Sequence, residues 1–167
     1  MNSPALRNEI AIDAGPLIAL ARIDLLDLPS RLFRDAVTTR TVVDECTADP
    51  DFIEAGPIKA ALANKTIRQT MPPVSTVYTF SNLDPGEISV LQYACIQKCA
   101  VLIDDRSARV SAQRLGLRVL GTCGLLVMAQ REQLLGPLQP LLLQLKQSGY
   151  YLADDLIKQV LALVGED

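Results

Sequence analysis

Short apolar runs alternate with longer helix-forming segments along most of the chain. The runs at residues 10–12, 36–39, 100–103 and 117–120 have the length and the β-branched or aliphatic content of buried strands, and an extended stretch is expected near Ile67. Helices are predicted at residues 17–22, 40–47, 52–64, 83–98, 107–115, 125–133, 137–146 and 154–164, with two short helical pieces at 23–33 and a loop at 71–81. Strands that alternate with helices imply right-handed crossovers. We therefore expect an α/β fold with three layers, α/β/α, around a mostly parallel sheet of about four or five strands.

The composition fits one folded domain. The chain has 167 residues, of which 49% are hydrophobic, and a chain of about 150 residues buries roughly 70% of the surface of its unfolded form. We expect a single domain over residues 1–167, with the helices of residues 137–164 packed on it. Aromatic residues make up only 4%, and the formal net charge is -3. Neither a base-stacking platform nor a surface coated with positive charge is therefore expected.

The chain has no histidine and four cysteines, a combination that argues against structural zinc. Cys46, Cys95, Cys99 and Cys123 include no C-x-x-C pair. Free thiols suit a reducing cytoplasm, which is the predicted location. The apolar run 10–21 superficially resembles a signal peptide, but an Asp and a Gly-Pro turn interrupt it. No segment approaches the roughly 20 apolar residues of a membrane span, so no membrane association is expected.

Carboxylates stand where predicted strands or loops lead into helices. Asp13 follows the first strand, Glu45 lies in the helix after the second, and Glu87 lies in the first turn of a later helix. Asp104 and Asp105 follow the strand that comes next. Ligands of an open parallel sheet bind beyond the carboxyl ends of its strands. Acids gathered there would repel one another unless a cation joined them, and oxygen ligands without imidazole favour Mg²⁺ or Mn²⁺.

Helix capping is the alternative explanation for the same acids. The segment Asp84-Pro85-Gly86-Glu87 has the sequence of a capping box, which by itself marks only the start of a helix. Asp13 and Asp105 also stand where N-cap residues stand. Glu45 is predicted within a helix, where a Glu is usually solvated. Taken one at a time, these acids leave capping and metal binding both open.

Two arginines follow the acid doublet. Arg106 and Arg109 either neutralise Asp104 and Asp105 or hold a phosphate near a metal, because the guanidinium fork matches phosphate oxygens. The sequence leaves both roles open.

The order of these pieces resembles the PIN-domain family of metal-dependent nucleases, which includes the VapC-type toxins of toxin-antitoxin pairs. Residues 10–20, Ile-Ala-Ile-Asp-Ala-Gly-Pro-Leu-Ile-Ala-Leu, are similar to the family's first motif, a hydrophobic strand that ends in a metal-binding Asp. The segments that end in Glu45, Glu87 and Asp105 resemble its second, third and fourth acidic positions. Residues 105–126 are also similar to one PIN-like subfamily whose members are often predicted to be toxin components. One departure is Ile103, which stands where the fourth motif often has Thr.

The resemblance implies hydrolysis of RNA phosphodiester bonds with one or two Mg²⁺ or Mn²⁺ ions. It implies that the catalytic acids are Asp13, Glu45, Glu87 and Asp105. It implies that the metal ligands are Asp13, Glu87, Asp104 and Asp105. Arg106 and Arg109 would contact phosphates of the substrate. Of the two adjacent acids, position favours Asp105 as the main ligand.

Other functions stay open from the sequence. A catalytically silent PIN-like module that binds RNA or a protein would use its acids only as caps, and a Mg²⁺-dependent phosphotransfer or phosphatase domain is a further possibility. As a toxin, the protein would bind a small antitoxin protein. The leucine-rich segments 23–33 and 134–145 would serve that contact, a homodimer contact or the core.

Overall fold

The central sheet is built from aliphatic runs that have the length of strands. The computed structural model describes residues 7–71 and 78–166, and five strands within them lie in the order β3-β2-β1-β4-β5, all parallel. They are β1 (Arg7–Ile12), β2 (Phe33–Thr39), β3 (Arg68–Thr70), β4 (Ala100–Leu102) and β5 (Val119–Leu120). Ile10 of β1 pairs with Ala36 on one side and with Ala100 on the other. β1 is therefore the central strand.

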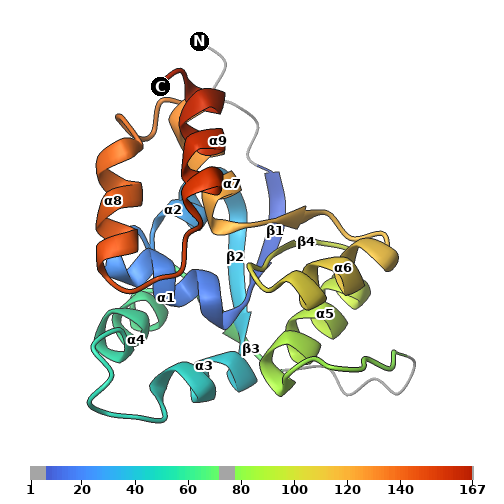
Figure 1. Ribbon diagram of the computed structural model, residues 1–167. Helices are drawn as coiled ribbons and strands as arrows, with labels where there is room; N and C mark the ends of the chain where they lie inside the picture. The colour runs from blue at the N-terminus through green and yellow to red at the C-terminus, as the bar shows by residue number, and fades with distance from the viewer. Residues whose placement is uncertain (1–6, 72–77, 167) are drawn as a thin grey trace.

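Helices cover both faces of the sheet (Figure 1). They are α1 (Ala14–Arg22), α2 (Leu28–Leu32), α3 (Arg40–Thr47), α4 (Ala55–Ala63), α5 (Pro85–Gln97), α6 (Arg106–Arg114), α7 (Thr122–Arg131), α8 (Gln139–Gln147) and α9 (Asp154–Val164). α5 and α6 lie on one side of the sheet, whereas α1, α2 and the C-terminal helices α7, α8 and α9 lie on the other. The predicted three-layer α/β/α fold around a parallel sheet is confirmed.

The core is almost entirely aliphatic, as the low aromatic content requires. Ile10 and Ile12 of β1 are fully buried, and fully buried Leu91 of α5 belongs to the same core cluster. Leu142 of α8 and Val160 of α9 belong to the same core cluster. The last two helices thus share apolar packing with the sheet layers.

The differences from the expected elements have local causes. α7 begins at Thr122, three residues earlier than predicted, because extended Gly121 precedes it and the Asp104 side chain accepts the Thr122 N–H. One helix, α2, forms within residues 23–33 where two pieces were expected, and β2 already begins at Phe33. Of the predicted loop 71–81, residues 72–77 lie outside the described part.

Membrane and cysteine features complete the fold. None of the helices in residues 7–71 and 78–166 is long and apolar enough to cross a membrane. All four cysteines are free thiols, and burial raises the pKa of Cys46 and of Cys99 to about 12. These two thiols therefore act as small core residues.

Candidate active site

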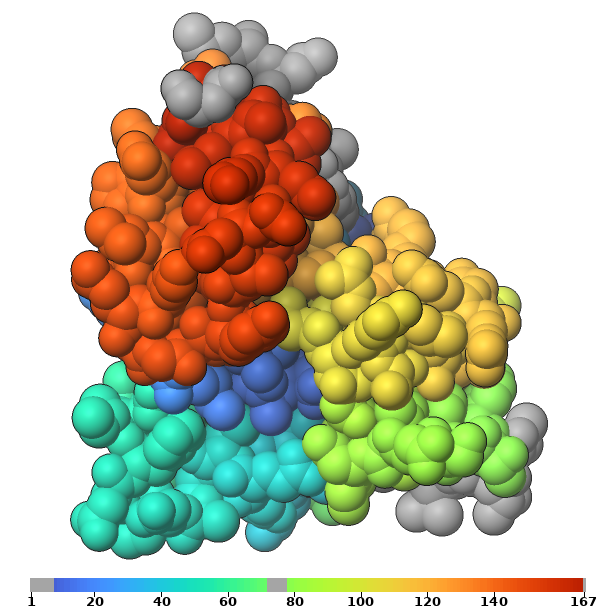
Figure 2. Space-filling view, viewed as in Figure 1, coloured from blue at the N-terminus to red at the C-terminus, as the bar shows by residue number. Residues whose placement is uncertain are grey.

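The chain reverses its direction across the sheet between β1 and β4, and this switch point positions the first acid. From β1 the chain moves outward to β2 and β3, and then returns to β4 and β5 on the other side. Such a reversal opens a crevice beyond the carboxyl ends of the two central strands. Asp13 directly follows β1, and its backbone N–H donates to the Leu102 carbonyl of β4 at 3.0 Å. In Figure 2 the blue β1–α1 segment reaches the surface between α3, α6 and the C-terminal helices.

Asp13 is buried without a full set of partners. Its residue is 5% exposed, and its Oδ1 atom has no hydrogen-bond partner among the described residues. Burial raises the pKa of Asp13 to about 7, and the negative charges of Glu87, Asp84 and Glu45 add to that rise, whereas the Ala14 N–H opposes it. An unpaired buried carboxylate oxygen is costly, so this position is unfavourable for the fold alone.

Two helices bring further acids to this place. Gly86 N–H of α5 donates to Oε1 of Glu45 of α3 at 2.9 Å. The predicted capping box forms: Glu87 N–H donates to Asp84 Oδ1 at 2.8 Å, and Asp84 N–H donates to Glu87 Oε2 at 3.0 Å. A side chain at position 86 would collide with the Glu45 carboxylate, so glycine permits the close approach of α3 and α5.

Buried hydroxyl groups hold α3 and α5 together. Thr39, the N-cap of α3, accepts the Val42 N–H at 3.2 Å, and its Oγ1 lies 2.6 Å from Oγ of Ser89 in α5. The Ser89 hydroxyl also donates to the Gly86 carbonyl at 2.7 Å. Because these contacts are buried, they fix the Gly86 amide where Glu45 meets it.

The four carboxylates of Asp13, Glu45, Asp84 and Glu87 form one electrostatic group, here called the acid cluster. Burial raises the pKa of Glu45 and of Glu87, and the charge of Asp84 raises both further. No lysine or arginine of the described ranges forms an ion pair with any of the four. The mutual repulsion is therefore not relieved by a cation of the protein itself.

The adjacent acids Asp104 and Asp105 have different hydrogen-bond partners and therefore different structural roles. Asp104 Oδ1 accepts the Thr122 N–H at 2.7 Å, and its Oδ2 accepts the Thr122 hydroxyl at 2.6 Å and the Tyr150 hydroxyl. Asp104 thus links β4, the start of α7 and the segment that precedes α9. Asp105 is exposed and caps α6 by accepting the Ala108 N–H at 2.9 Å, while its charge raises the pKa of Glu87.

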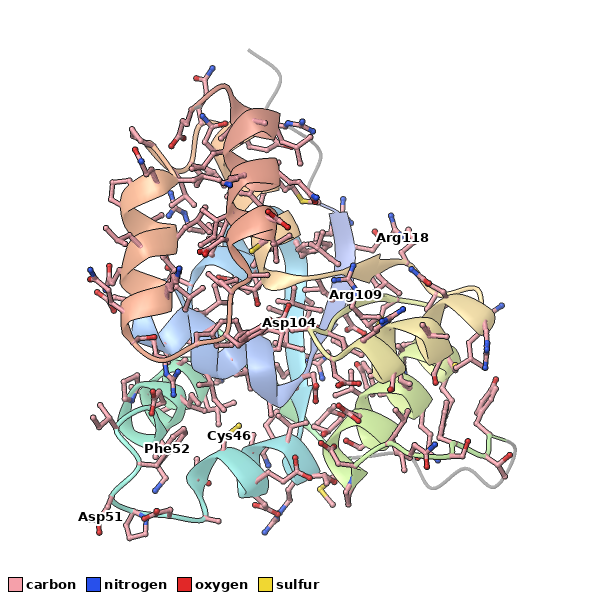
Figure 3. All side chains as sticks on the ribbon, viewed as in Figure 1. Cys46, Asp51, Phe52, Asp104, Arg109 and Arg118 are labelled. Carbon is pink, nitrogen blue, oxygen red and sulfur yellow. The ribbon has the colours of Figure 1, made fainter. Side chains whose placement is uncertain are left out.

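The two arginines after the doublet differ in exposure. Arg106 is exposed in the first turn of α6, whereas Arg109 is half-buried and lines a cavity of about 490 Å³ together with Asp104 and Tyr150. A Cβ at Gly121 would lie 2.9 Å from Arg109 Nη1, so this glycine leaves room for the guanidinium. Figure 3 shows Arg109 beside the strand end that carries Asp104.

The donor chemistry of the acid cluster suits a hard divalent cation. All of the donors are carboxylate oxygens, and Asp13 Oδ1 is buried and unpaired. Glu45, Glu87 and Asp105 each direct one oxygen to a backbone N–H, which leaves each a second oxygen. As placed, however, no three Asp, Glu or Cys side chains in the described sequence form a complete set for one ion. The residues that could hold a metal are Asp13, Glu45, Glu87 and Asp105, once their side chains turn toward one ion.

Asp84 is the member of the cluster that sequence reasoning assigned only to capping. The capping box contained the missing signal, because the N-cap and N3 residues of one helix lie on the same first turn. Where Glu87 meets the other acids, Asp84 therefore lies close as well, and its charge raises the pKa of Asp13 and Glu45.

A comparison with protein-family models finds one family that matches this chain. The sequence model of the PIN domain matches residues 9–166, which include the acid cluster, Asp105 and both arginines. A search of curated proteins finds no match.

Proposed function

Because this chain belongs to the PIN-domain family, whose members are generally nucleases that use divalent metal ions, we propose that it is a metal-dependent endoribonuclease. The observation that carries the proposal is the buried Oδ1 atom of Asp13, which has no hydrogen-bond partner within residues 7–71 and 78–166. The charges of three further acids raise the pKa of Asp13, and no lysine or arginine of these ranges pairs with any of the four. An external Mg²⁺ or Mn²⁺ ion would offset the repulsion between the acids and would coordinate the Oδ1 atom of Asp13.

The residues would divide the work as follows. Asp13, Glu87 and Asp105 would hold the ion, and Glu45, fixed by the Gly86 amide, would orient water or a second ion. The ion would polarise the phosphate and supply hydroxide near neutral pH. The chain offers no histidine as a general base. Arg106 and Arg109 would bind substrate phosphates through their guanidinium groups.

We propose Asp105 rather than Asp104 as the ligand at the end of β4. Both oxygens of Asp104 are already engaged by Thr122 and Tyr150, whereas one oxygen of Asp105 is left over. Asp104 would then position the C-terminal segment beside the site, without a metal contact.

The test is cleavage of a single-stranded RNA with Mg²⁺ or Mn²⁺. We expect Asp13→Asn and Asp105→Asn to lower the rate by roughly 100-fold or more, about 2.7 kcal/mol in activation free energy. Asp51→Asn is the matched control, because Asp51 is an exposed acid outside the cluster (Figure 3). Equal rates in all four proteins would exclude the site.

A toxin function is the finer proposal. Its support is an apolar cavity of about 300 Å³ next to the acid cluster, lined by Ala14, Ile18 and Phe52, with Ile53 86% exposed nearby. A small antitoxin protein would cover this surface and the acids together. Expression of the wild type should arrest growth, and Asp13→Asn should not. Growth arrest by both proteins, or by neither, would count against a nuclease toxin.

The second candidate is a catalytically silent PIN-like module that binds RNA or protein. It is favoured by the caps, since Asp84, Glu87 and Asp105 each accept a backbone N–H and no complete ligand set is present in the described residues. Single-domain organisation, cytoplasmic location and a homodimer through leucine-rich surface stay predictions. Sedimentation of the full chain measures the last of these.

A further inference from the structure

A long basic segment begins beside the acid cluster. Residues 106–131 contain five arginines and no aspartate or glutamate, although acids outnumber lysines and arginines in the whole chain, 19 to 16. Arg106 and Arg114 stand at positions i and i+8 of α6, with Val110 between them at i+4, and all three are exposed. That spacing puts them on one face of the helix. α6 forms part of the molecular surface in Figure 2, in yellow.

Arg114 at the end of α6 and Arg118 after it have no side-chain partners among the described residues, unlike Arg22 and Arg68. Arg22 is paired with Glu54 at 2.5 Å, and Arg68 with Asp35 at 2.6 Å. In contrast, the structure of residues 78–166 contains no ion pair or hydrogen bond made by the side chains of Arg114 and Arg118. Their charges therefore remain available to an external anion.

Two further cations, Arg118 and Lys98, lie together beyond the C-terminal end of α6. Arg118 follows the turn after α6, and Lys98 follows α5, and both line one cavity of about 420 Å³ together with Gly116. Two cations on one cavity repel each other unless an anion lies between them. Arg106, Arg114, Arg118 and Lys98 are here called the basic track.

The dimensions of the basic track match a nucleic-acid backbone. α6 has 9 residues and is therefore about 13 Å long, since each residue rises about 1.5 Å. In a base-paired helix each strand carries one charge per roughly 3.4 Å of helix axis, so a strand in that helical form places about four phosphates along this length, and a more extended single strand places fewer. Asp105 caps the start of α6, and its charge raises the pKa of Glu87 of the acid cluster.

We propose that the basic track binds the phosphate backbone of an RNA strand as it passes from the acid cluster along α6 to the cavity at Arg118 and Lys98. This inference rests on the proposed nuclease function and extends it beyond Arg106 and Arg109. Guanidinium groups bind phosphate without regard to the bases, and the chain has few aromatic residues for stacking. The basic track therefore contributes affinity for strand length and not for sequence.

The test is the salt dependence of binding to an oligouridylate long enough to cover α6. Binding is measured in the Asp13→Asn background to prevent cleavage. Two phosphate contacts contribute about 1.4 to the slope of log affinity against log salt, at about 0.7 each for a single strand. Arg114→Gln with Arg118→Gln should make the slope shallower by that amount. An oligodeoxythymidylate should show the same change, since the track binds phosphates.

The matched control is Arg34→Gln with Lys59→Gln, which removes the same charge at exposed sites away from α6. Its slope should change by much less, and the dinucleotide UpU should show no difference between the two double variants. Equal slopes for both double variants, or an absence of oligonucleotide binding, would overturn the basic track. Cleavage that depends on Asp13 but is accompanied by equal slopes would leave the proposed function intact and remove only the track.

Discussion

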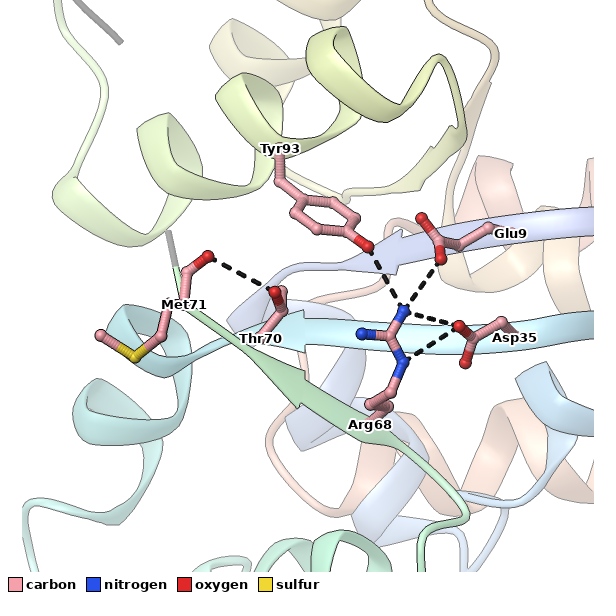
Figure 4. A network of polar contacts seen from close by, with 6 residues as sticks. All are labelled: Glu9, Asp35, Arg68, Thr70, Met71 and Tyr93. Atoms are coloured by element: carbon pink, nitrogen blue, oxygen red, sulfur yellow. Dashed lines mark hydrogen bonds and ion pairs between the residues drawn. The ribbon is translucent and has the colours of Figure 1, made fainter. Parts of the chain in front are cut away.

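The two ends of β1 carry carboxylates in opposite electrostatic situations. Near the start of the strand, Glu9 and Asp35 of β2 share the Arg68 guanidinium, with Nη2 at 3.0 Å from Glu9 and 2.6 Å from Asp35 (Figure 4). The Tyr93 hydroxyl also accepts from Nη2 at 3.4 Å. The hydrogen bonds to Asp35 and Tyr93 raise the pKa of Arg68. At the other end of β1, Asp13 and three more acids form no ion pair with a cation of the described part of the chain.

This difference shows what each group of acids does. The Arg68 group contains a cation between its two acids, and it ties the edge strand β3 to the centre of the sheet. The acid cluster keeps its repulsion, and Asp13 keeps a buried oxygen without a partner in the described structure. Strain of this kind persists where the surrounding fold over-determines it, and it is typical of functional sites. An external cation would do for the acid cluster what Arg68 does for Glu9 and Asp35.

The largest expected effect is on the pH dependence of stability without metal. The pKa of Asp13 is raised from 3.8 to about 7, so between about pH 4 and pH 7 the folded protein keeps a proton that the unfolded chain has lost. The free energy of unfolding should therefore fall as pH rises through this window, by at most about 1.4 kcal/mol per pH unit for this one group. Urea unfolding in a chelator measures it.

Asp13→Asn is the control for that prediction. Without the ionisable group, the decline between about pH 4 and pH 7 should become much weaker, and the metal-free variant should be more stable than the wild type at pH 8. A decline of the same steepness in the variant would assign the pH dependence to other groups.

A smaller loss of stability is expected at the end of β1 where Arg68 pairs with Glu9 and Asp35. Arg68→Gln leaves Glu9 and Asp35 beside each other without their cation, and should lower the free energy of unfolding by about 2 kcal/mol, limited by the partial exposure of the pair. The triple variant with Glu9→Gln and Asp35→Asn should recover part of this loss. If the triple variant is no more stable than Arg68→Gln, repulsion between the two acids is not the cause.

The smallest effect on stability is expected from Gly86→Ala. The new methyl group would push the Glu45 carboxylate away from the Gly86 amide, but Glu45 is a flexible side chain that can move. Alanine also favours a helix over glycine by up to about 1 kcal/mol, so the change in unfolding free energy should stay within about 1 kcal/mol. RNA cleavage should nevertheless fall by roughly tenfold, because Glu45 loses its fixed position. Unchanged cleavage would remove Glu45 from the mechanism.

The sheet could be predicted from the sequence because fully buried parallel strands consist of continuous apolar runs. Residues 10–12 and 100–103 have that pattern, and they became β1 and β4 with the acids directly after them. The capping box of Asp84 and Glu87, with Pro85 at the first helical position, also indicated where α5 begins. These features are local, so a sequence pattern is sufficient to find them.

Contacts between distant segments could not be predicted in the same way. The contact of Asp104 with Tyr150 joins residues 46 positions apart, and nothing near Asp104 in the sequence indicates that partner. The start of α7 at Thr122 depends on the same side chain. The contribution of Asp84 to the acid cluster likewise depends on how α5 packs against α3.

The most direct test of the account is thermal and urea stability at about pH 8 with increasing Mn²⁺ or Mg²⁺, a pH at which Asp13 is ionised. The wild type and Asp51→Asn should gain about 2.7 kcal/mol at a hundredfold excess of metal over the dissociation constant, and Asp13→Asn should gain little. No gain in the wild type, or the same gain in Asp13→Asn, would contradict a metal site at the acid cluster and favour the silent module.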